Sequence, residues 1–166
     1  QTGPELWLSN GYSGTGTRIV ADMVPGPAGL DPKHLETVHY DRVAFVGTDS
    51  THGEELWLAS GTSSRCLDLV PGPAGSSPRG LFYSSDDLYF SAETMAAGRE
   101  PWMAEGIELR NARMLADVHP GSASSMQPDD RFVIAEKHVL FVADDGRHGR
   151  EPWVIPAGAI SRSPGQ

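Results

Sequence analysis

The sequence has a single cysteine, Cys66, so no disulfide can form within the chain. It has no apolar run near the roughly 18 to 20 residues that a membrane-spanning helix requires. Its thirteen Lys and Arg residues are scattered, and twenty-two Asp and Glu residues outnumber them, giving a net charge of −9. A nucleic-acid binder needs a basic face to neutralise phosphates. We therefore expect no membrane span and no nucleic-acid partner.

Glycine and proline are abundant, with nineteen and thirteen residues among 166. Glycine costs backbone entropy in a helix and proline removes a hydrogen-bond donor, so this richness favours short strands joined by turns. The apolar fraction of 39% and the charged fraction of 21% are those of an ordinary globular chain. Together these features predict an all-β domain.

One four-residue motif recurs four times and contains every tryptophan of the chain. Its tryptophans, which are 50, 45 and 51 residues apart, are Trp7, Trp57, Trp102 and Trp153. A fixed period of this size is the signature of a repeat architecture. We expect units at about 5–54, 55–99 and 100–154 within one domain over 1–157, followed by a flexible tail over 158–166.

A β-hairpin is predicted in front of each of the last three tryptophans. Phe45, Phe90 and Phe141 stand in short apolar strands, each twelve residues before a tryptophan. A glycine lies four residues before each tryptophan. Glycine adopts the positive φ that tight turns need, so the constant spacing indicates two strands joined by a turn.

Two further strands are predicted in each unit. Downstream of the tryptophan, an apolar stretch runs to a Pro-Gly pair, in residues 18–26, 66–72 and 114–121. Another proline then leads into a second apolar stretch, in residues 35–38, 81–83 and 132–135. Four short strands per unit at this period are typical of β-propeller blades.

The order of these motifs resembles the ELWxxDGT repeat family of bacterial proteins. The resemblance rests on Glu-Leu-Trp, on Gly-Thr at 16–17 and 61–62, on the Pro-Gly-x-x-Gly turn, and on Asp-Gly-x-His-Gly at 145–149. It covers nearly all of residues 3–154, although the third copy has Gly106–Ile107 in place of Gly-Thr. The resemblance implies propeller-like blades and a secreted or surface-exposed bacterial protein, and it implies no defined reaction.

Three units are too few for an ordinary propeller, which closes with about four to eight blades. The first tryptophan strand, Glu5–Leu8, also has no phenylalanine strand before it in the sequence. Unpaired strand edges are sticky and are normally protected. We expect either a homodimer that completes a six-bladed ring or a fragment of a longer repeat array.

The repeated carboxylates favour structural roles over catalytic ones. A glutamate begins each tryptophan motif, and an aspartate precedes each Pro-Gly pair. Catalytic pairs are normally used once, whereas a group at the same place in every unit is expected to cap a turn or accept backbone donors. The alternative is calcium, which takes oxygen ligands and would be bound at the turns containing Asp49, Asp144 and Asp145.

Other catalytic patterns are weak. His52 and His148 hold equivalent turn positions, but Ala97 replaces them in the middle unit, and no Cys or second His lies at a zinc-ligand spacing. No Gly-x-Ser-x-Gly motif is present. Cys66 aligns with apolar residues of the other units, which indicates a core position. We therefore predict no enzyme activity. A propeller domain of a hydrolase is the second of two alternatives to the binding function described next.

The aromatic residues suggest where a ligand would bind. The four repeated tryptophans favour packing between units, with a sugar-binding platform as the alternative. Tyr12, Tyr40 and Tyr83 fall outside the repeated pattern and are the candidate ligand-binding residues. We expect a non-enzymatic interaction module that binds protein or glycan through its loop face, and the first alternative is a multivalent glycan-binding lectin.

Overall fold

The computed structural model describes residues 3–12, 16–20, 22–61 and 63–156. These residues form thirteen β-strands and no helix, which confirms the predicted all-β class. The described chain accordingly has no helix of the length and apolarity that crossing a bilayer requires. The tail predicted at 158–166 lies outside the described residues.

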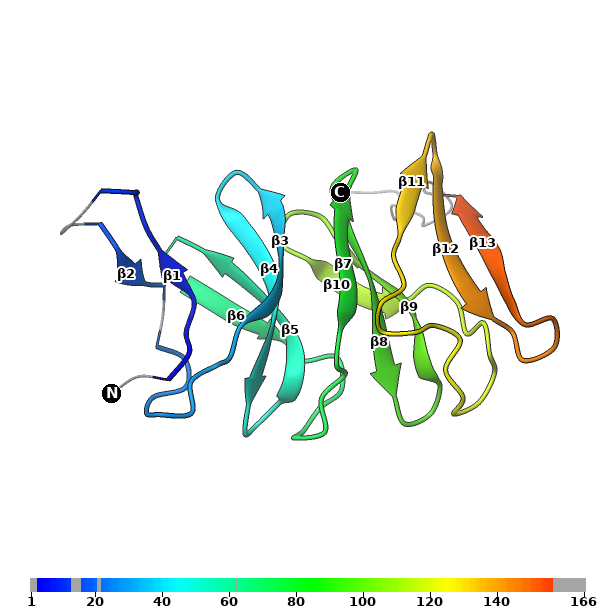
Figure 1. The fold of residues 1–166 in the computed structure, drawn as a ribbon, viewed down its shortest axis with the longest axis horizontal. Coiled ribbons are helices and arrows are strands. Elements are labelled where there is room, and N and C mark those ends of the chain that lie inside the picture. Colours follow the sequence, from blue (N-terminus) through cyan, green and yellow to red (C-terminus); the bar gives the residue numbers. More distant parts are fainter. Residues whose placement is uncertain (1–2, 13–15, 21, 62, 157–166) are drawn as a thin grey trace.

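The strands form four antiparallel sheets, each made of strands that follow one another in the chain (Figure 1). The first sheet has two strands, β1 (Trp7–Leu8) and β2 (Arg18–Ile19). The second has four, β3 (Lys33–His39), β4 (Arg42–Asp49), β5 (Gly53–Ser60) and β6 (Ser63–Leu67). The third has β7 (Arg79–Ser84), β8 (Asp87–Thr94), β9 (Gly98–Glu105) and β10 (Arg110–Met114). The last has β11 (Val133–Ala135), β12 (His138–Asp144) and β13 (Arg150–Pro156).

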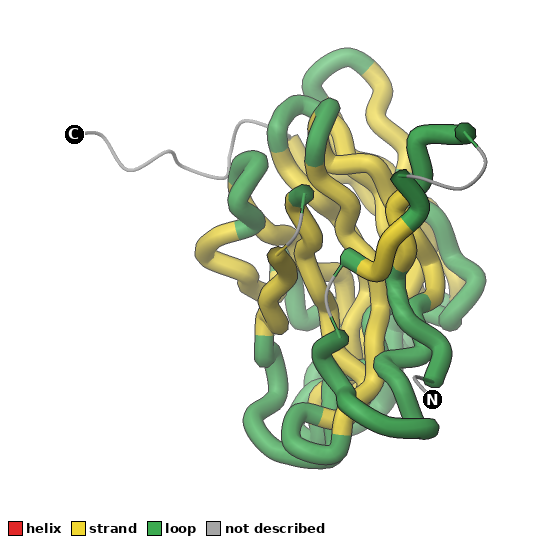
Figure 2. The backbone as a smooth tube through the Cα atoms, turned by 90° about the vertical axis from the view of Figure 1, so that its left-hand side faces the viewer, coloured by secondary structure: helices red, strands yellow, loops and turns green. Residues whose placement is uncertain are grey.

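The sheets follow one another along the long axis of the molecule, and the connections lie at the two ends of the strands (Figures 1 and 2). The sheets are offset by two strands from the sequence units. The unit at about 55–99, for example, contributes β5 and β6 to the second sheet and β7 and β8 to the third. Each of these two sheets therefore takes its strands from two sequence units.

The pairing register follows the twelve-residue spacing of the sequence. Phe45 lies opposite Trp57, Phe90 opposite Trp102, and Phe141 opposite Trp153. The turns between the paired strands use the glycines as expected, with positive φ angles of 70° at Gly53, 62° at Gly98 and 82° at Gly149. The three predicted hairpins are thus confirmed.

Three apolar clusters fill the spaces between neighbouring sheets. Phe45 of β4 belongs to the cluster shared with the first sheet, and its neighbour Ala44 belongs to the cluster shared with the third sheet. In β8, Phe90 and Tyr89 are divided in the same way between the second and third clusters. Successive side chains of a strand point to opposite faces. The two central sheets are therefore buried on both faces.

The fourth strand of each central sheet ends earlier than its apolar stretch. β6 ends at Leu67, and beyond it the Val70 amide donates a hydrogen bond to the Glu55 carboxylate at 3.0 Å. Beyond β10, the Val118 amide donates to the Glu100 carboxylate at 2.9 Å. These amides satisfy a buried carboxylate instead of extending the strand ladder.

Candidate functional site

Every tryptophan motif is preceded by a glycine and one further residue, and in β5 and β9 this glycine begins the strand. The four copies are Gly3–Glu5, Gly53–Glu55, Gly98–Glu100 and Gly149–Glu151. We call each copy a Gly-x-Glu platform. Residues two apart in a strand share a face, so the glycine and the glutamate side chain face the same neighbour.

The platform of β5 carries the turn that follows β6. The carboxylate of Glu55 is fully buried and accepts hydrogen bonds from the Val70 amide at 3.0 Å and the Ser76 hydroxyl at 2.6 Å. The carbonyl of Glu54 accepts the Ser76 amide at 3.1 Å. A Cβ atom on Gly53 would lie 2.6 Å from the carbonyl oxygen of Pro73. Only glycine lets the turn pack this closely.

The platform of β9 repeats this arrangement with the turn after β10. Glu100 is also fully buried, and it accepts the Ser125 hydroxyl at 2.7 Å and the Val118 amide at 2.9 Å. The Arg99 carbonyl accepts the Ser125 amide at 3.0 Å. Two platforms thus hold their turns with the same set of carbonyl, carboxylate and hydroxyl groups.

The first platform lacks the hydrogen bond from a serine hydroxyl to the glutamate that the other two have. The Pro4 carbonyl accepts the Leu30 amide at 2.9 Å, and Oε1 of Glu5 accepts the same amide at 3.1 Å. Leu30 stands where Ser76 and Ser125 stand in the other turns, four residues after the glycine of Pro-Gly. It supplies no hydroxyl, and Oε2 of Glu5 is buried without a hydrogen-bond partner among the described residues. This platform is the least well satisfied of the three.

Burial raises the pKa of Glu5, Glu55 and Glu100, because desolvation of the carboxylate outweighs the hydrogen bonds that the turns donate. All three glutamates accept backbone amides from the turn that follows. The role expected for the repeated glutamates, to accept backbone donors, is therefore confirmed for these three.

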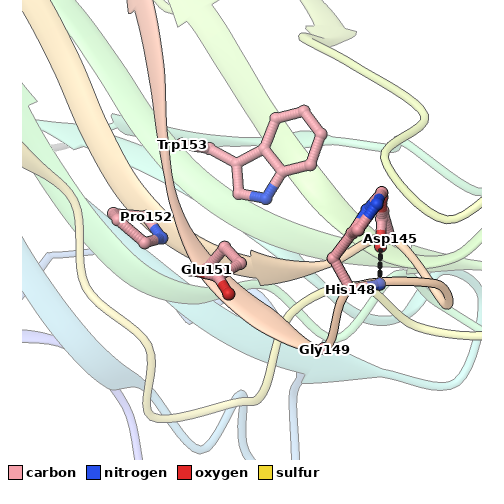
Figure 3. A pocket seen from close by; sticks show the side chains of 6 residues that line it. All are labelled: Asp145, His148, Gly149, Glu151, Pro152 and Trp153. Carbon is pink, nitrogen blue, oxygen red and sulfur yellow. Dashed lines mark hydrogen bonds and ion pairs between the residues drawn. The ribbon is translucent and has the colours of Figure 1, made fainter.

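The fourth platform is open. Glu151 is exposed, and no turn amide or hydroxyl reaches it from residues 3–156 as far as the structure describes them. A Cβ on Gly149 would meet no atom within 4 Å in the described chain. The surface forms a pocket lined by Asp145, His148, Gly149, Glu151, Pro152 and Trp153 (Figure 3). The pocket occupies the place that a turn fills on the other platforms.

The acidic turns next to two platforms are built alike. Oδ1 of Asp49 accepts the amides of Thr51 and His52, and its Oδ2 lies 2.7 Å from Nδ1 of His52. Burial alone would raise the pKa of Asp49, but the hydrogen bonds from His52 and Thr51 prevail and lower it. The Asp49 carboxylate in turn raises the pKa of His52.

Asp145 and His148 form the same pair in the last hairpin, with 2.7 Å between Oδ2 and Nδ1. Hydrogen bonds from the backbone and ring of His148 lower the pKa of Asp145, and the carboxylate raises the pKa of His148. Asp144 accepts the Gly146 amide at 2.8 Å. No group of three or more His, Cys, Asp or Glu residues suited to a metal ion occurs in the described chain. Calcium at Asp49, Asp144 and Asp145 stays a prediction.

The tryptophans have unequal surroundings. Trp57 is buried, stacks on Phe45 with ring centroids 6.5 Å apart, and donates its indole N–H to the Gly47 carbonyl at 3.3 Å. Trp153 is half-buried and donates to the Ala143 carbonyl at 3.2 Å. Trp102 packs partly buried against the cluster between the central sheets, whereas Trp7 on β1 is 57% exposed. Of the four tryptophans, Trp57 therefore fits the expected packing between sheets best, and Trp7 fits it least.

The three candidate tyrosines lie on separate elements. Tyr40 is 99% exposed at the turn between β3 and β4, and Tyr12 is exposed in the connection between β1 and β2. Tyr83 is half-buried on β7, where its amide donates to the Glu36 carboxylate of β3 at 2.9 Å. The connections that carry Tyr12 and Tyr40 lie at the upper end of the strands in Figure 1.

Sequence reasoning did not identify Ser76 and Ser125 as partners of the glutamates. The available signal is their position four residues after the glycine of a Pro-Gly pair. Sequence reasoning also did not identify Arg99, whose buried guanidinium donates a hydrogen bond to the Ser77 carbonyl at 2.8 Å. No protein-family model, curated protein or solved structure matches this chain.

Proposed function

We propose that this chain forms part of a β-propeller scaffold that binds a partner protein without catalysis. The observation that carries the proposal is that the repeated glutamates have structural partners. Glu55 and Glu100 are buried, and their carboxylates hydrogen-bond to the turns that cover them. The two most exposed aromatic residues, Tyr12 and Tyr40, instead stand on connections between strands. In a rigid repeat scaffold such connections are the usual place for binding residues. The family resemblance adds the proposal that the protein is secreted or displayed on a bacterial surface.

The propeller arrangement is supported by how the sheets are stacked. Each central sheet is a four-stranded antiparallel meander, and such meanders are the blades of propellers. The first strands of neighbouring sheets also lie side by side, since the Tyr83 amide of β7 donates to Glu36 of β3. Blades converge in this way on a common axis when a ring forms.

Tyr12 and Tyr40 define the binding end that we propose. An exposed tyrosine offers an apolar ring and a hydroxyl together, which suits protein interfaces. Met95 provides a matched control, because it is also highly exposed but stands in the turn between β8 and β9, at the lower end in Figure 1.

The test applies the fluorescently labelled full chain to an array of extracellular proteins and to an array of surface glycans. We expect binding to one or more proteins, loss of that binding in Tyr12→Ser/Tyr40→Ser, and no change in Met95→Ser. Binding to glycans alone would favour the lectin alternative. Turnover of a bound molecule, or equal loss of binding in both variants, would contradict the proposal.

The assembly is tested by light scattering after size exclusion, with and without a calcium chelator. A mass of twice the 17.8 kDa chain supports the homodimer that completes a six-bladed ring. A stable monomer contradicts the homodimer and leaves the longer repeat array. A change of mass on chelation would support the predicted calcium.

A further inference from the structure

The last platform, Gly149–Glu151, offers the same groups as the three platforms on which a turn packs, which we call occupied. In the three occupied copies, the carbonyl between the glycine and the glutamate accepts two amides of the following turn. The corresponding carbonyl in β13 belongs to Arg150, and no turn amide from the described residues reaches it. Likewise, no turn from the described residues covers Glu151 or Gly149. The groups that bind a turn in the other copies are thus present here, and no turn between residues 3 and 156, as far as they are described, uses them.

The edge of β13 that faces away from β12 extends this surface. β5 pairs with β4 on one side and β6 on the other, and β9 pairs with β8 and β10 in the same way. Within the part of the chain that the structure describes, β13 pairs only with β12. An unpaired strand edge presents backbone donors and acceptors to an added strand.

The outer face of the last sheet is also uncovered. Leu58 of β5 is 4% exposed, whereas Val154, at the same position of β13, is 54% exposed. Val46 of β4 is fully buried, whereas its counterpart Val142 of β12 is exposed. Apolar side chains that a neighbouring sheet covers in the middle of the molecule thus face solvent here.

We propose that the Gly149–Glu151 platform and the edge of β13 form a binding site for a strand-and-turn segment of another repeat of this type. The segment would pair with β13 as β6 pairs with β5, and would place a Pro-Gly-x-x-Gly-Ser turn on the platform. Its serine hydroxyl and a preceding amide would hydrogen-bond to Glu151, and two turn amides would bind the Arg150 carbonyl. This proposal does not depend on the tyrosine surface.

The occupant is specified by the three occupied copies. Each of them holds a turn that starts with Pro-Gly, and two of the three turns supply a serine hydroxyl to the glutamate. The turns of a second copy of this chain are already engaged on that copy's own platforms. We therefore assign the site to an additional repeat rather than to a described segment of a second copy.

The probe is a synthetic peptide with the sequence of residues 63–79, which comprises β6 and its turn, with Cys66→Ser to prevent oxidation. It is titrated into the isotope-labelled full chain, and amide chemical shifts are followed by NMR. We expect saturable shifts at Gly149, Arg150 and Glu151 and along β13. Shifts confined to β1 and β2, or no shifts at millimolar peptide, would overturn the proposal.

A double-mutant cycle tests the predicted contact. Glu151→Ala in the chain and Ser76→Ala in the peptide are each expected to weaken binding about tenfold, since each removes a hydrogen bond to a charged group. Combining them should weaken binding little further, because both remove the same contact. The matched control is Glu136→Ala, an exposed glutamate between β11 and β12, which should leave binding within about twofold.

Two results would assign the site to other occupants. If the peptide binds a chain ending at Pro156 but not the full chain, residues 157–166 compete for the platform and the proposal is wrong. If the signals of Gly149 and Glu151 change with protein concentration alone while the mass doubles, a second copy covers the site, and the proposal is again wrong.

Discussion

Residues 53–57, at the start of β5, and residues 149–153, which lead into β13, have nearly the same sequence and opposite surroundings. Both run Gly-x-Glu-x-Trp and pair with a preceding strand in the same register. Yet Glu55 is buried beneath a turn and Glu151 is exposed, and the neighbouring His52 and His148 side chains are 32% and 74% exposed. The motif fixes the hairpin, whereas the segment that follows it decides whether the glutamate stabilises the fold.

The largest expected difference between the two strands is in the contribution of an apolar side chain to the free energy of unfolding. Leu58→Ala should lower the free energy of unfolding by about 2–5 kcal/mol, because it leaves a cavity between two sheets. Val154→Ala should lower it by less than about 1 kcal/mol, because that side chain already faces solvent. Urea unfolding followed by tryptophan fluorescence measures both. Equal losses would mean that the outer face of the last sheet is covered in solution.

Glu55→Ala should lower the free energy of unfolding by about 2 kcal/mol more than Glu151→Ala does. Glu55→Ala leaves the Val70 amide and the Ser76 hydroxyl buried without their acceptor, and the relief of carboxylate desolvation offsets part of that cost. Glu151→Ala should have almost no effect on unfolding of the chain alone. A control pairs Glu55→Ala with Ser76→Ala, which should cost less than the sum of the single variants.

The glycines provide a smaller contrast. Gly53→Ala and Gly149→Ala both place a side chain at positive φ, which costs about 1–2 kcal/mol in either position. Gly53→Ala should cost about 1 kcal/mol more, because its Cβ would also approach the Pro73 carbonyl. Thermal unfolding of the two variants measures this difference. A greater loss at Gly149 would show that its platform is occupied.

The smallest expected effect is electrostatic and concerns the turn before β5. The pKa of His52 is raised, so its ion pair with Asp49 stabilises the fold fully below 6.5, and that contribution is lost as pH rises through the raised value. The pKa of Asp49 is lowered, so the contribution of this carboxylate is present above 3.8 and is lost as pH falls below it. His52→Ala, which copies Ala97 of the middle turn, should flatten the decline of unfolding free energy between about pH 6 and 8. An unchanged slope would contradict this role.

The hairpins were predictable because their signals are local. The spacing from Phe45 to Trp57 and the glycine between them specify strand, turn and register without reference to the rest of the chain. The partner of Glu55 was not predictable, since Ser76 lies 21 residues away and reaches the carboxylate only after the long connection folds back. For the same reason the exposure of Trp7 and Glu151 does not follow from their motif. The binding roles of Tyr12, Tyr40 and Tyr83 stay predictions.

The order of strands also bears on how the chain acquires its structure. Every sheet pairs strands that are consecutive in sequence, so the chain segments to be closed between partners are short and their entropic cost is low. During synthesis, the sheet from β3 to β6 can assemble once residue 67 has left the ribosome, before the third sheet exists. Each finished sheet then offers its platform and exposed face as a template for the next, so folding is expected to advance from the N-terminus one sheet at a time.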